Sequence, residues 1–361
     1  MNLPFEESIL CLPMPMLVGF VLAVVLLPSF IKYLRTRAIG QFVRADGPKE
    51  HAGKANTPTG GGIVFLFAAC VGSIAWFFYS GKFGVPALTV LLVTNVCGII
   101  GLSDDLAKIA NKDNRGISGK IRLGLELVLG LCLGLILLST ASVPSAIGIF
   151  TVPVWFYLAF SAFVVAAATN AVNLHDGMDG LAAGTACQIL ATLGFMLYYQ
   201  GSYELAAISA AAAGSTAGFL VFNRNPAHIF MGDTGSLLLG GVMAALALSG
   251  NLVLWFIPLS LIYILETLSV MAQVVYFKLT KPYASDKSVN ALSLVWIKLT
   301  QKLSGEGKRL FLMAPLHHHF EALGQKKGVK EWQIVACFHI AQFILCLITI
   351  VTFINVRNLL P

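Results

Sequence analysis

Ten apolar stretches, each long enough to cross a bilayer, set the limits on what this chain can fold into. They begin near Met14, Gly61, Gly84, Ile121, Val152, Gly180, Tyr203, Gly235, Leu252 and Gln333. A spanning helix needs about 20 mostly apolar residues, and lipid satisfies no backbone polar group that lies outside a helix or closed barrel. The sequence, which is 57% hydrophobic and 11% charged, therefore predicts an all-α integral membrane protein. We expect a bundle of about ten transmembrane helices that forms one polytopic domain over residues 1–361.

Basic residues concentrate in connections of one parity. They occupy residues 32–54, 108–122 and 278–330, together with Arg224, whereas the opposite connections hold little more than Lys82. Because Lys and Arg accumulate in cytoplasmic loops, this pattern predicts that these connections face the cytoplasm and that both termini lie outside it. The net charge of +7 is explained by these loops, so we expect no nucleic-acid partner.

The third apolar stretch ends in two adjacent carboxylates. Asp104 and Asp105 are followed by Lys108, which shares their helix face if the helix continues. An ionised acid in hydrocarbon costs at least about 2.5 kcal/mol, so such a pair persists where it meets water, a cation or a substrate. One interpretation is a site where a metal meets an anion. The alternative is a solvated helix end that marks the membrane boundary.

Two further connections on the same side carry acids beside glycines. The connection after the fifth stretch contains Asn173, Asp176 and Asp179, more polar groups than an ordinary turn needs. The connection after the seventh stretch places Asp233 in a Gly-Asp-Thr-Gly turn, three residues after Phe230. A carboxylate there could bind a cation while the helix N-terminus faces an anion. The alternative is a helix N-cap, with Phe230 as a membrane contact.

Basic, hydroxyl and imidazole groups occupy the remaining connections of this side. Lys54 and Thr59 lie in a proline- and glycine-rich stretch that suits a phosphate or serves as a flexible lead-in, and Lys120 opens the fourth apolar stretch. Three consecutive histidines occupy positions 317–319; neighbouring residues do not share a helix face, so one zinc site made of all three is not expected. The collected acids suit Mg²⁺, and the bases suit a diphosphate.

Four motifs resemble those of the phospho-N-acetylmuramoyl-pentapeptide-transferase family, within the superfamily of polyprenyl-phosphate N-acetylhexosamine-1-phosphate transferases. They are Asp-Asp-x-x-Lys at 104–108, Asn-Leu-x-Asp-Gly-x-Asp-Gly-Leu-Ala at 173–182, Gly-Asp-Thr-Gly-Ser at 232–236, and Met-Ala-Pro-x-His-His-His-Phe-Glu at 313–321. The resemblance covers nearly the whole chain, including the ten stretches. The histidine block separates this family from related transferases that use N-acetylglucosamine phosphates.

The resemblance implies a reaction and a location. UDP-N-acetylmuramoyl-pentapeptide and undecaprenyl phosphate would give lipid I and UMP, the first membrane step of peptidoglycan synthesis. The protein would be a Mg²⁺-dependent phosphoglycosyl transferase, multi-pass in the bacterial cytoplasmic (inner) membrane. Its termini would be periplasmic, its active site would lie on the cytoplasmic face, and it would be a homodimer.

The resemblance also implies roles for single residues. Asp233 would bind Mg²⁺, and Asp104 would orient or deprotonate the acceptor phosphate with the help of Asp105. Lysines would hold phosphates, while polar and aromatic residues would bind the uridine and sugar of the donor. The substrate-binding set is Lys54, Thr59, Lys108, Lys120, Asn173, Asp176, Asp179, Asn223, Phe230, His317, His318 and His319.

The chain departs from the family pattern at three places. Gly60 replaces a methionine, His175 stands where the family usually has threonine, and an insertion is expected around 281–307. These departures concern loop geometry and leave the acidic motif residues unchanged.

Two other functions stay open at this point. The first is a related transferase that uses UDP-N-acetylglucosamine. The second is a secondary transporter with Glu126, Glu266 and His339 as intramembrane coupling sites. Transporters usually place such sites near the midplane between repeats, whereas here no repeat is visible and the acids gather at one face.

Overall fold

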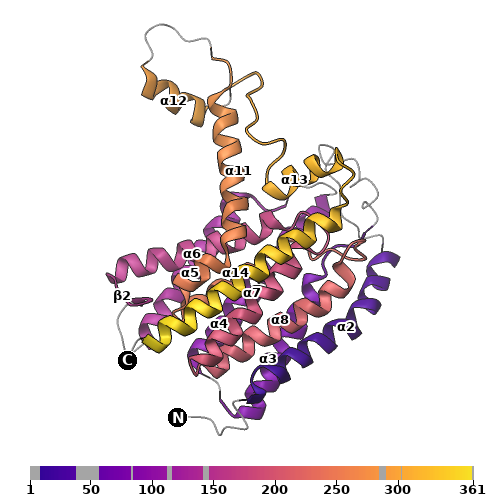
Figure 1. The fold of residues 1–361 in the computed structure, drawn as a ribbon, viewed down its shortest axis with the longest axis vertical. Helices are drawn as coiled ribbons and strands as arrows, with labels where there is room; N and C mark the ends of the chain where they lie inside the picture. Colours follow the sequence, from indigo (N-terminus) through magenta and orange to yellow (C-terminus); the bar gives the residue numbers. More distant parts are fainter. Residues whose placement is uncertain are drawn as a thin grey trace.

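The computed structural model describes residues 9–37, 57–82, 84–111, 116–140, 146–283, 290–301 and 303–359. In Figure 1 these residues form a bundle of helices with one short hairpin. The helices are α2 (Pro13–Thr36), α3 (Gly62–Ser80), α4 (Val85–Asn111), α5 (Gly119–Thr140), α6 (Val154–His175), α7 (Leu181–Tyr199), α8 (Tyr203–Asn223), α9 (Gly232–Ser249), α10 (Val253–Leu259), α11 (Leu261–Leu279), α12 (Ala291–Thr300), α13 (Leu316–Gln325) and α14 (Glu331–Leu359). The hairpin pairs β1 (Ala146–Ile147) antiparallel with β2 (Phe150–Thr151).

Ten helices of the described ranges are long and apolar enough to cross a membrane, namely α2 to α9, α11 and α14. This finding confirms the predicted all-α membrane protein. Except for the ninth, each span begins within a few residues of its predicted start. The agreement follows because apolar length alone decides which segments can be buried in lipid.

The ninth apolar stretch is interrupted, so the prediction of one helix from Leu252 is wrong. Pro258 lies in the last turn of α10, and α11 begins after Ser260. Proline lacks the backbone N–H and clashes with the preceding turn, and the Ser260 hydroxyl donates to the Phe256 carbonyl at 2.7 Å. The spanning segment is therefore α11 alone.

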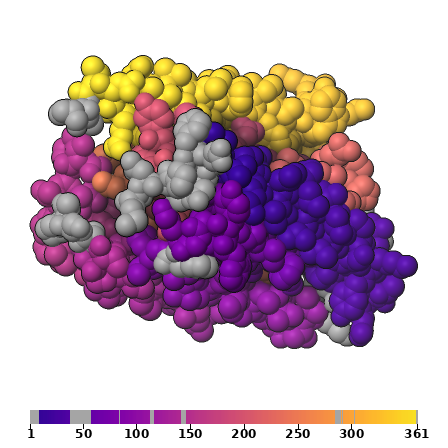
Figure 2. All heavy atoms as spheres, turned by 90° about the horizontal axis from the view of Figure 1, so that it is seen from below, coloured from indigo at the N-terminus to yellow at the C-terminus, as the bar shows by residue number. Residues whose placement is uncertain are grey.

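The centre of the bundle is formed by α8 and α9. α8 packs against α2, α3 and α7, and α9 packs against α3, α4 and α6. α8 is rich in alanine, glycine and serine, and such small side chains let membrane helices approach closely. Figure 2 shows the outer helices from the end where the chain begins: α14 (yellow) covers one side of this face, and the first third of the chain (indigo to purple) covers the other.

The two ends of the bundle differ. In Figure 1, α2 begins and α14 ends at the lower end, while α13 lies at the upper end and α11 extends beyond the bundle there. The segment expected to be inserted contains α12. Two lysines connect α12 with α11: Lys278 Nζ donates to the Leu299 carbonyl at 2.9 Å, and Lys298 Nζ donates to the Leu279 carbonyl at 2.8 Å. Residues 284–289 and 302 of that segment lie outside the described ranges.

Candidate active site

The polar end of α4 meets the start of α9. α4 continues past the acidic pair, so Asp104, Asp105 and Lys108 lie on one helix, and both acids are buried. A Cβ atom at Gly101 would lie 2.2 Å from the backbone carbonyl oxygen of Asp233. Only glycine allows this approach, which brings motifs more than 120 residues apart in sequence into direct contact.

Asp105 caps the N-terminus of α9 from another helix. Its Oδ1 accepts the backbone N–H of Asp233 at 3.0 Å, and its Oδ2 accepts the N–H and hydroxyl of Thr234 at 2.9 and 2.7 Å. Gly232 has a φ of +72°, which favours glycine, and a Cβ there would lie 2.6 Å from Oδ2 of Asp105. Both oxygens of Asp105 are therefore engaged in holding the start of α9, where a negative charge is stabilised by the helix dipole.

The Asp233 carboxylate is surrounded by donors. Lys108 Nζ and Arg122 Nη1 donate to its Oδ2 at 2.9 and 3.2 Å, and Asn173 Nδ2 donates to its Oδ1 at 2.9 Å. Lys108 Nζ also lies 2.8 Å from Oδ2 of Asp104. One ammonium group therefore bridges the carboxylates of Asp104 and Asp233, two acids that the sequence analysis placed on the same face of the membrane.

The donor set at this point fits a hard cation. Asp104 and Asp233 offer carboxylate oxygens to one position, and oxygen ligands are those that Mg²⁺ prefers. Asp176 lies outside the spans, and its pKa is raised to about 7 by burial and then by the carboxylates of Asp233, Asp105 and Asp179. Negative charge therefore accumulates around Asp176, and the carboxylates of Asp233, Asp105 and Asp179 contribute to it.

Arg122 is a site residue that the sequence analysis missed. Besides Asp233, its guanidinium contacts Asn170 Oδ1 at 3.2 Å and lies 3.8 Å from Oε1 of the fully buried Glu126. Asn170 also donates to Glu126. The available signal was an Arg and a Glu four residues apart at the start of an apolar stretch, a pair that is costly in lipid unless the two side chains meet.

The prediction that Asn173 lies in a connecting loop is wrong. Asn173 lies in the last turn of α6, because this helix continues to His175. The helix points the Asn173 amide at α9, where it also donates to the Ser236 hydroxyl at 3.0 Å. Helical geometry therefore sets the position of Asn173 relative to Asp233.

Asp179 and Asn223 organise the turn that follows α8. The Asn223 side chain accepts the N–H of Gly180 at 3.1 Å and donates to the Ile229 carbonyl at 2.9 Å. The Asp179 carboxylate accepts the N–H of Ala227 at 3.0 Å. These contacts are made with the protein's own turns, so the substrate-binding roles of both residues stay predictions.

The glycine-rich first connection pairs with the connection before α9. Thr59 and Phe230 form a parallel β-bridge, and the N–H of Phe230 donates to the Pro58 carbonyl at 2.8 Å. Lys120 is exposed at the start of α5, and no ion pair involves it within the described ranges. Lys54 lies outside the described residues.

The three histidines have different surroundings. His317 is fully buried, and its backbone N–H donates to Oε1 of Glu266 at 3.1 Å. Burial lowers the pKa of His317 to about 4, so its imidazole is neutral at neutral pH. His318 Nδ1 lies 2.8 Å from Oε2 of Glu321, and His319 Nδ1 accepts a backbone N–H at 3.2 Å. The three histidines therefore differ in burial and in the groups that their side chains contact.

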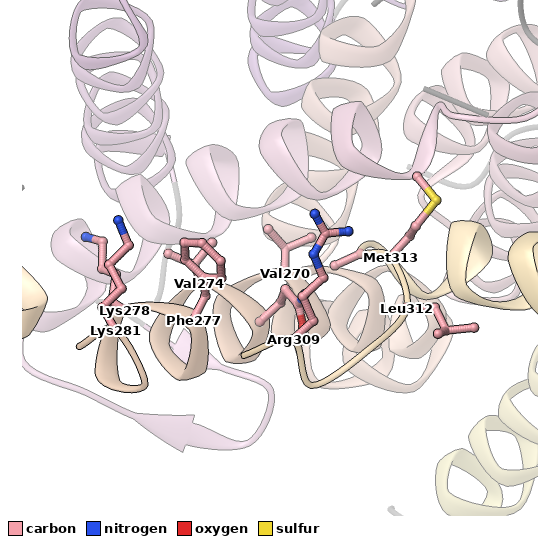
Figure 3. Close-up of a pocket in the computed structure, with 10 residues that line it drawn as sticks. Val270, Val274, Phe277, Lys278, Lys281, Arg309, Leu312 and Met313 are labelled. Carbon is pink, nitrogen blue, oxygen red and sulfur yellow. The ribbon is translucent and has the colours of Figure 1, made fainter. Parts of the chain in front are cut away.

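A groove of about 460 Å³ runs beside α11. It is lined by Val270, Gln273, Val274, Phe277, Lys278, Lys281, Arg309, Leu312, Met313 and Ala314. Figure 3 shows Lys278 and Lys281 at one end, Arg309 nearer the middle and Met313 towards the other end. An apolar floor with cations along it suits a hydrocarbon chain that carries an anionic head group.

Known proteins resemble this chain over most of its length. Residues 87–251 match Glycosyl transferase family 4. The chain is 37% identical over 327 residues to the phospho-N-acetylmuramoyl-pentapeptide-transferase of Halalkalibacterium halodurans, which covers 90% of this chain and 91% of the relative. For the proteins of the same name from Acaryochloris marina and Bacillus pumilus, the identities are 41% over 314 residues (86% and 78% of the two chains) and 34% over 339 residues (92% and 95%). The chain therefore belongs to the phospho-N-acetylmuramoyl-pentapeptide-transferase family and is a multi-pass membrane transferase.

Proposed function

We propose that this protein transfers phospho-N-acetylmuramoyl-pentapeptide from UDP-N-acetylmuramoyl-pentapeptide to undecaprenyl phosphate, producing lipid I and UMP with Mg²⁺ as cofactor. The observation that carries this proposal is the meeting of Asp104 and Asp233 around the Lys108 ammonium group, in a chain whose relatives bear this enzyme's name. The acceptor is a phosphate on a long isoprenoid, so the reaction has to occur where lipid meets water. Acids at the ends of spanning helices suit that boundary.

The roles of the residues follow from their contacts. Mg²⁺, when bound, neutralises the diphosphate of the donor and stabilises the leaving UMP. Asp233, with Asp104 facing it, would hold the ion. Lys108 and Arg122 supply positive charge to phosphate oxygens beside the two acids. A phosphate oxygen barely needs a base at neutral pH, so we propose that Asp104 acts mainly by orienting the acceptor.

The groove beside α11 is our proposed site for the isoprenoid chain of the acceptor. Its apolar lining comes from α11, a helix largely exposed on its outer side, and its basic side chains, Lys278, Lys281 and Arg309, suit the anionic head groups of surrounding lipids. Met313 and Ala314 of the same groove lie just before Pro315, the N-cap residue of α13. The groove therefore leads from lipid towards α13, whose outer histidines, His318 and His319, we assign to the donor.

The location of the site completes the proposal. The basic connections support an active site on the cytoplasmic face of the inner membrane, with periplasmic termini. Figure 1 is consistent with this arrangement, because α13 lies at the end opposite to the start of α2 and the end of α14. We further propose a homodimer, which crosslinking of the protein in native membranes would test.

The deciding experiment measures UMP release by the full chain in detergent with undecaprenyl phosphate. We expect release with UDP-N-acetylmuramoyl-pentapeptide, little release with UDP-N-acetylglucosamine, and none of either after Mg²⁺ is removed with EDTA. A preference for UDP-N-acetylglucosamine would assign the protein to the related transferases. Absence of UMP release, together with solute flux in vesicles that lack nucleotide sugar, would instead support a transporter.

A further inference from the structure

Three buried side chains from three separate elements meet in a second cluster, which shares no residue with the acidic one. They are His175 at the end of α6, Glu266 in α11 and His317 in α13, and none is more than 1% exposed. One ligand atom of each lies within 4.8 Å of the others. His317 Nδ1 is 3.3 Å from Glu266 Oε2, and His175 Nδ1 is 3.7 Å from Glu266 Oε1. The cluster is therefore compact and centred on the carboxylate.

The polar atoms of this cluster are poorly satisfied. Within the part of the chain that the structure describes, none of the four ring nitrogens of His175 and His317 makes a well-aligned hydrogen bond, and the two Nδ1 atoms only face the Glu266 carboxylate. Buried polar atoms nearly always have one, so each exception calls for an explanation. Glu266 accepts the backbone N–H of His317, which cannot neutralise a buried carboxylate charge. A cation bound between the three side chains would give the ring nitrogens a partner and would also neutralise the carboxylate charge of Glu266.

The surroundings fix how the two rings are turned. A Cβ atom at Gly177 would lie 2.2 Å from Nε2 of His317, so this edge of the ring rests on the backbone and Nδ1 is left to face Glu266. The ring of Tyr263 packs on His175 at a centroid distance of 4.5 Å, and its hydroxyl is engaged with Thr185 at 2.7 Å. The Nδ1 atoms of both histidines are therefore directed at the same carboxylate.

We propose that His175, Glu266 and His317 bind a borderline transition-metal dication such as Zn²⁺. Two imidazoles and one carboxylate are an established zinc ligand set, and imidazole favours zinc over magnesium. Ligand atoms about 2.1 Å from one ion lie about 3.4 Å apart in a tetrahedron. The 3.3 Å pair already has this separation, and His175, which is 3.7 Å from the carboxylate, would move closer to complete the set.

This metal site is separate from the proposed Mg²⁺ position. The set at Asp104 and Asp233 is made of oxygen atoms, whereas the set described here contains two nitrogens and lies on α6, α11 and α13. Its zinc would fasten the histidine block to two spanning helices and act as a structural cross-link. Because His175 replaces the usual threonine, the site is expected only in chains that carry histidine at this position.

Zinc content tests the proposal directly. The full chain, purified through a tag without histidine and stripped with a chelator, is exposed to Zn²⁺, gel-filtered and analysed by mass spectrometry of the metal. We expect about one zinc per chain in the wild type and at least a tenfold loss in His175→Thr and Glu266→Gln. His228→Thr is the matched control, because His228 is exposed on another connection; it should bind zinc like the wild type. Zinc should also raise the unfolding temperature of the wild type and leave that of His175→Thr unchanged.

Substitution with Co²⁺ identifies the ligands. The wild type should give visible bands of a four- or five-coordinate ion without the near-ultraviolet band of a cobalt thiolate, and His175→Thr should lose them. Three results would overturn the proposal: a wild type that takes up no zinc, a His175→Thr variant that keeps it, or a thiolate band. Loss of zinc in His319→Asn but not in His175→Thr would place the metal on the outer histidines instead. A thermal unfolding transition of His175→Thr without zinc shows that this variant is folded. If the transition is absent, the zinc content of Glu266→Gln tests the proposal instead.

Discussion

Replacing Asp105 tests whether the cap that α4 supplies to α9 sets the position of Asp233. Asp105 accepts hydrogen bonds from the backbone of Asp233 and from the backbone and hydroxyl of Thr234. Asp105→Ala removes all of these acceptors, while Asp105→Asn keeps one oxygen in the same place. The two variants therefore separate loss of the cap from loss of the charge.

The expected cost follows from these contacts. Loss of an N-cap acceptor costs about 0.5–2 kcal/mol, and an unsatisfied buried N–H costs about 1–3 kcal/mol. The helix-dipole contribution reaches about 2 kcal/mol where the charge is partly buried. Because these contributions overlap, we expect Asp105→Ala to destabilise the attachment of α9 by about 3 kcal/mol. Asparagine keeps one acceptor but turns an NH2 group towards a backbone N–H, so Asp105→Asn should cost about 1–2 kcal/mol, less than Asp105→Ala.

Two measurements read out this difference. Thermal unfolding in detergent should show a drop of several degrees for Asp105→Ala and a small drop for Asp105→Asn. UMP release titrated with Mg²⁺ should require more of the ion in Asp105→Ala, because Asp233 is displaced, and should be largely restored in Asp105→Asn. Glu306→Gln, which removes an exposed acid, controls for a general effect of charge.

One result would refute the cap interpretation. If Asp105→Asn were as inactive as Asp233→Asn while its unfolding temperature equalled that of the wild type, the Asp105 charge would act directly in the reaction. Asp105 would then keep the catalytic role that its place in the Asp-Asp-x-x-Lys motif suggests.

Three further predictions concern other contacts of the site. Asp233→Asn removes the proposed Mg²⁺ ligand and should lower UMP release at least about a hundredfold; a variant with a tenth of wild-type activity would contradict the metal role. Arg122→Met removes the cation beside buried Glu126 and leaves it with Asn170 alone, so unfolding measurements should show a loss of about 3 kcal/mol, part of it recovered when Glu126→Gln is added. The folded-state pKa of Asp176 is about 7 against an ordinary 3.8, so stability is lost as pH rises through that window. Asp176→Asn should therefore raise the unfolding temperature more at about pH 8 than at about pH 5, and equal gains would contradict the shift.

The sequence by itself determined the membrane architecture and the identity of the site motifs. Apolar length is a local property, so the ten spans could be predicted from the chain alone. The cost of acids in lipid likewise singled out Asp104, Asp105 and Asp233 without knowledge of their partners. The break after Pro258 escaped the prediction because the flanking residues are apolar on both sides.

Only the tertiary structure decided what each polar group contacts. Adjacent residues on a helix point about 100° apart, so Asp104 turns towards the side chain of Lys108, whereas Asp105 turns towards the backbone N–H groups that open α9. The meeting of His175 with Glu266 and His317 depends in the same way on how α6, α11 and α13 pack. Such contacts join residues dozens to more than a hundred positions apart. They are set by the rotation and packing of whole helices, which the apolar pattern of each helix leaves undetermined.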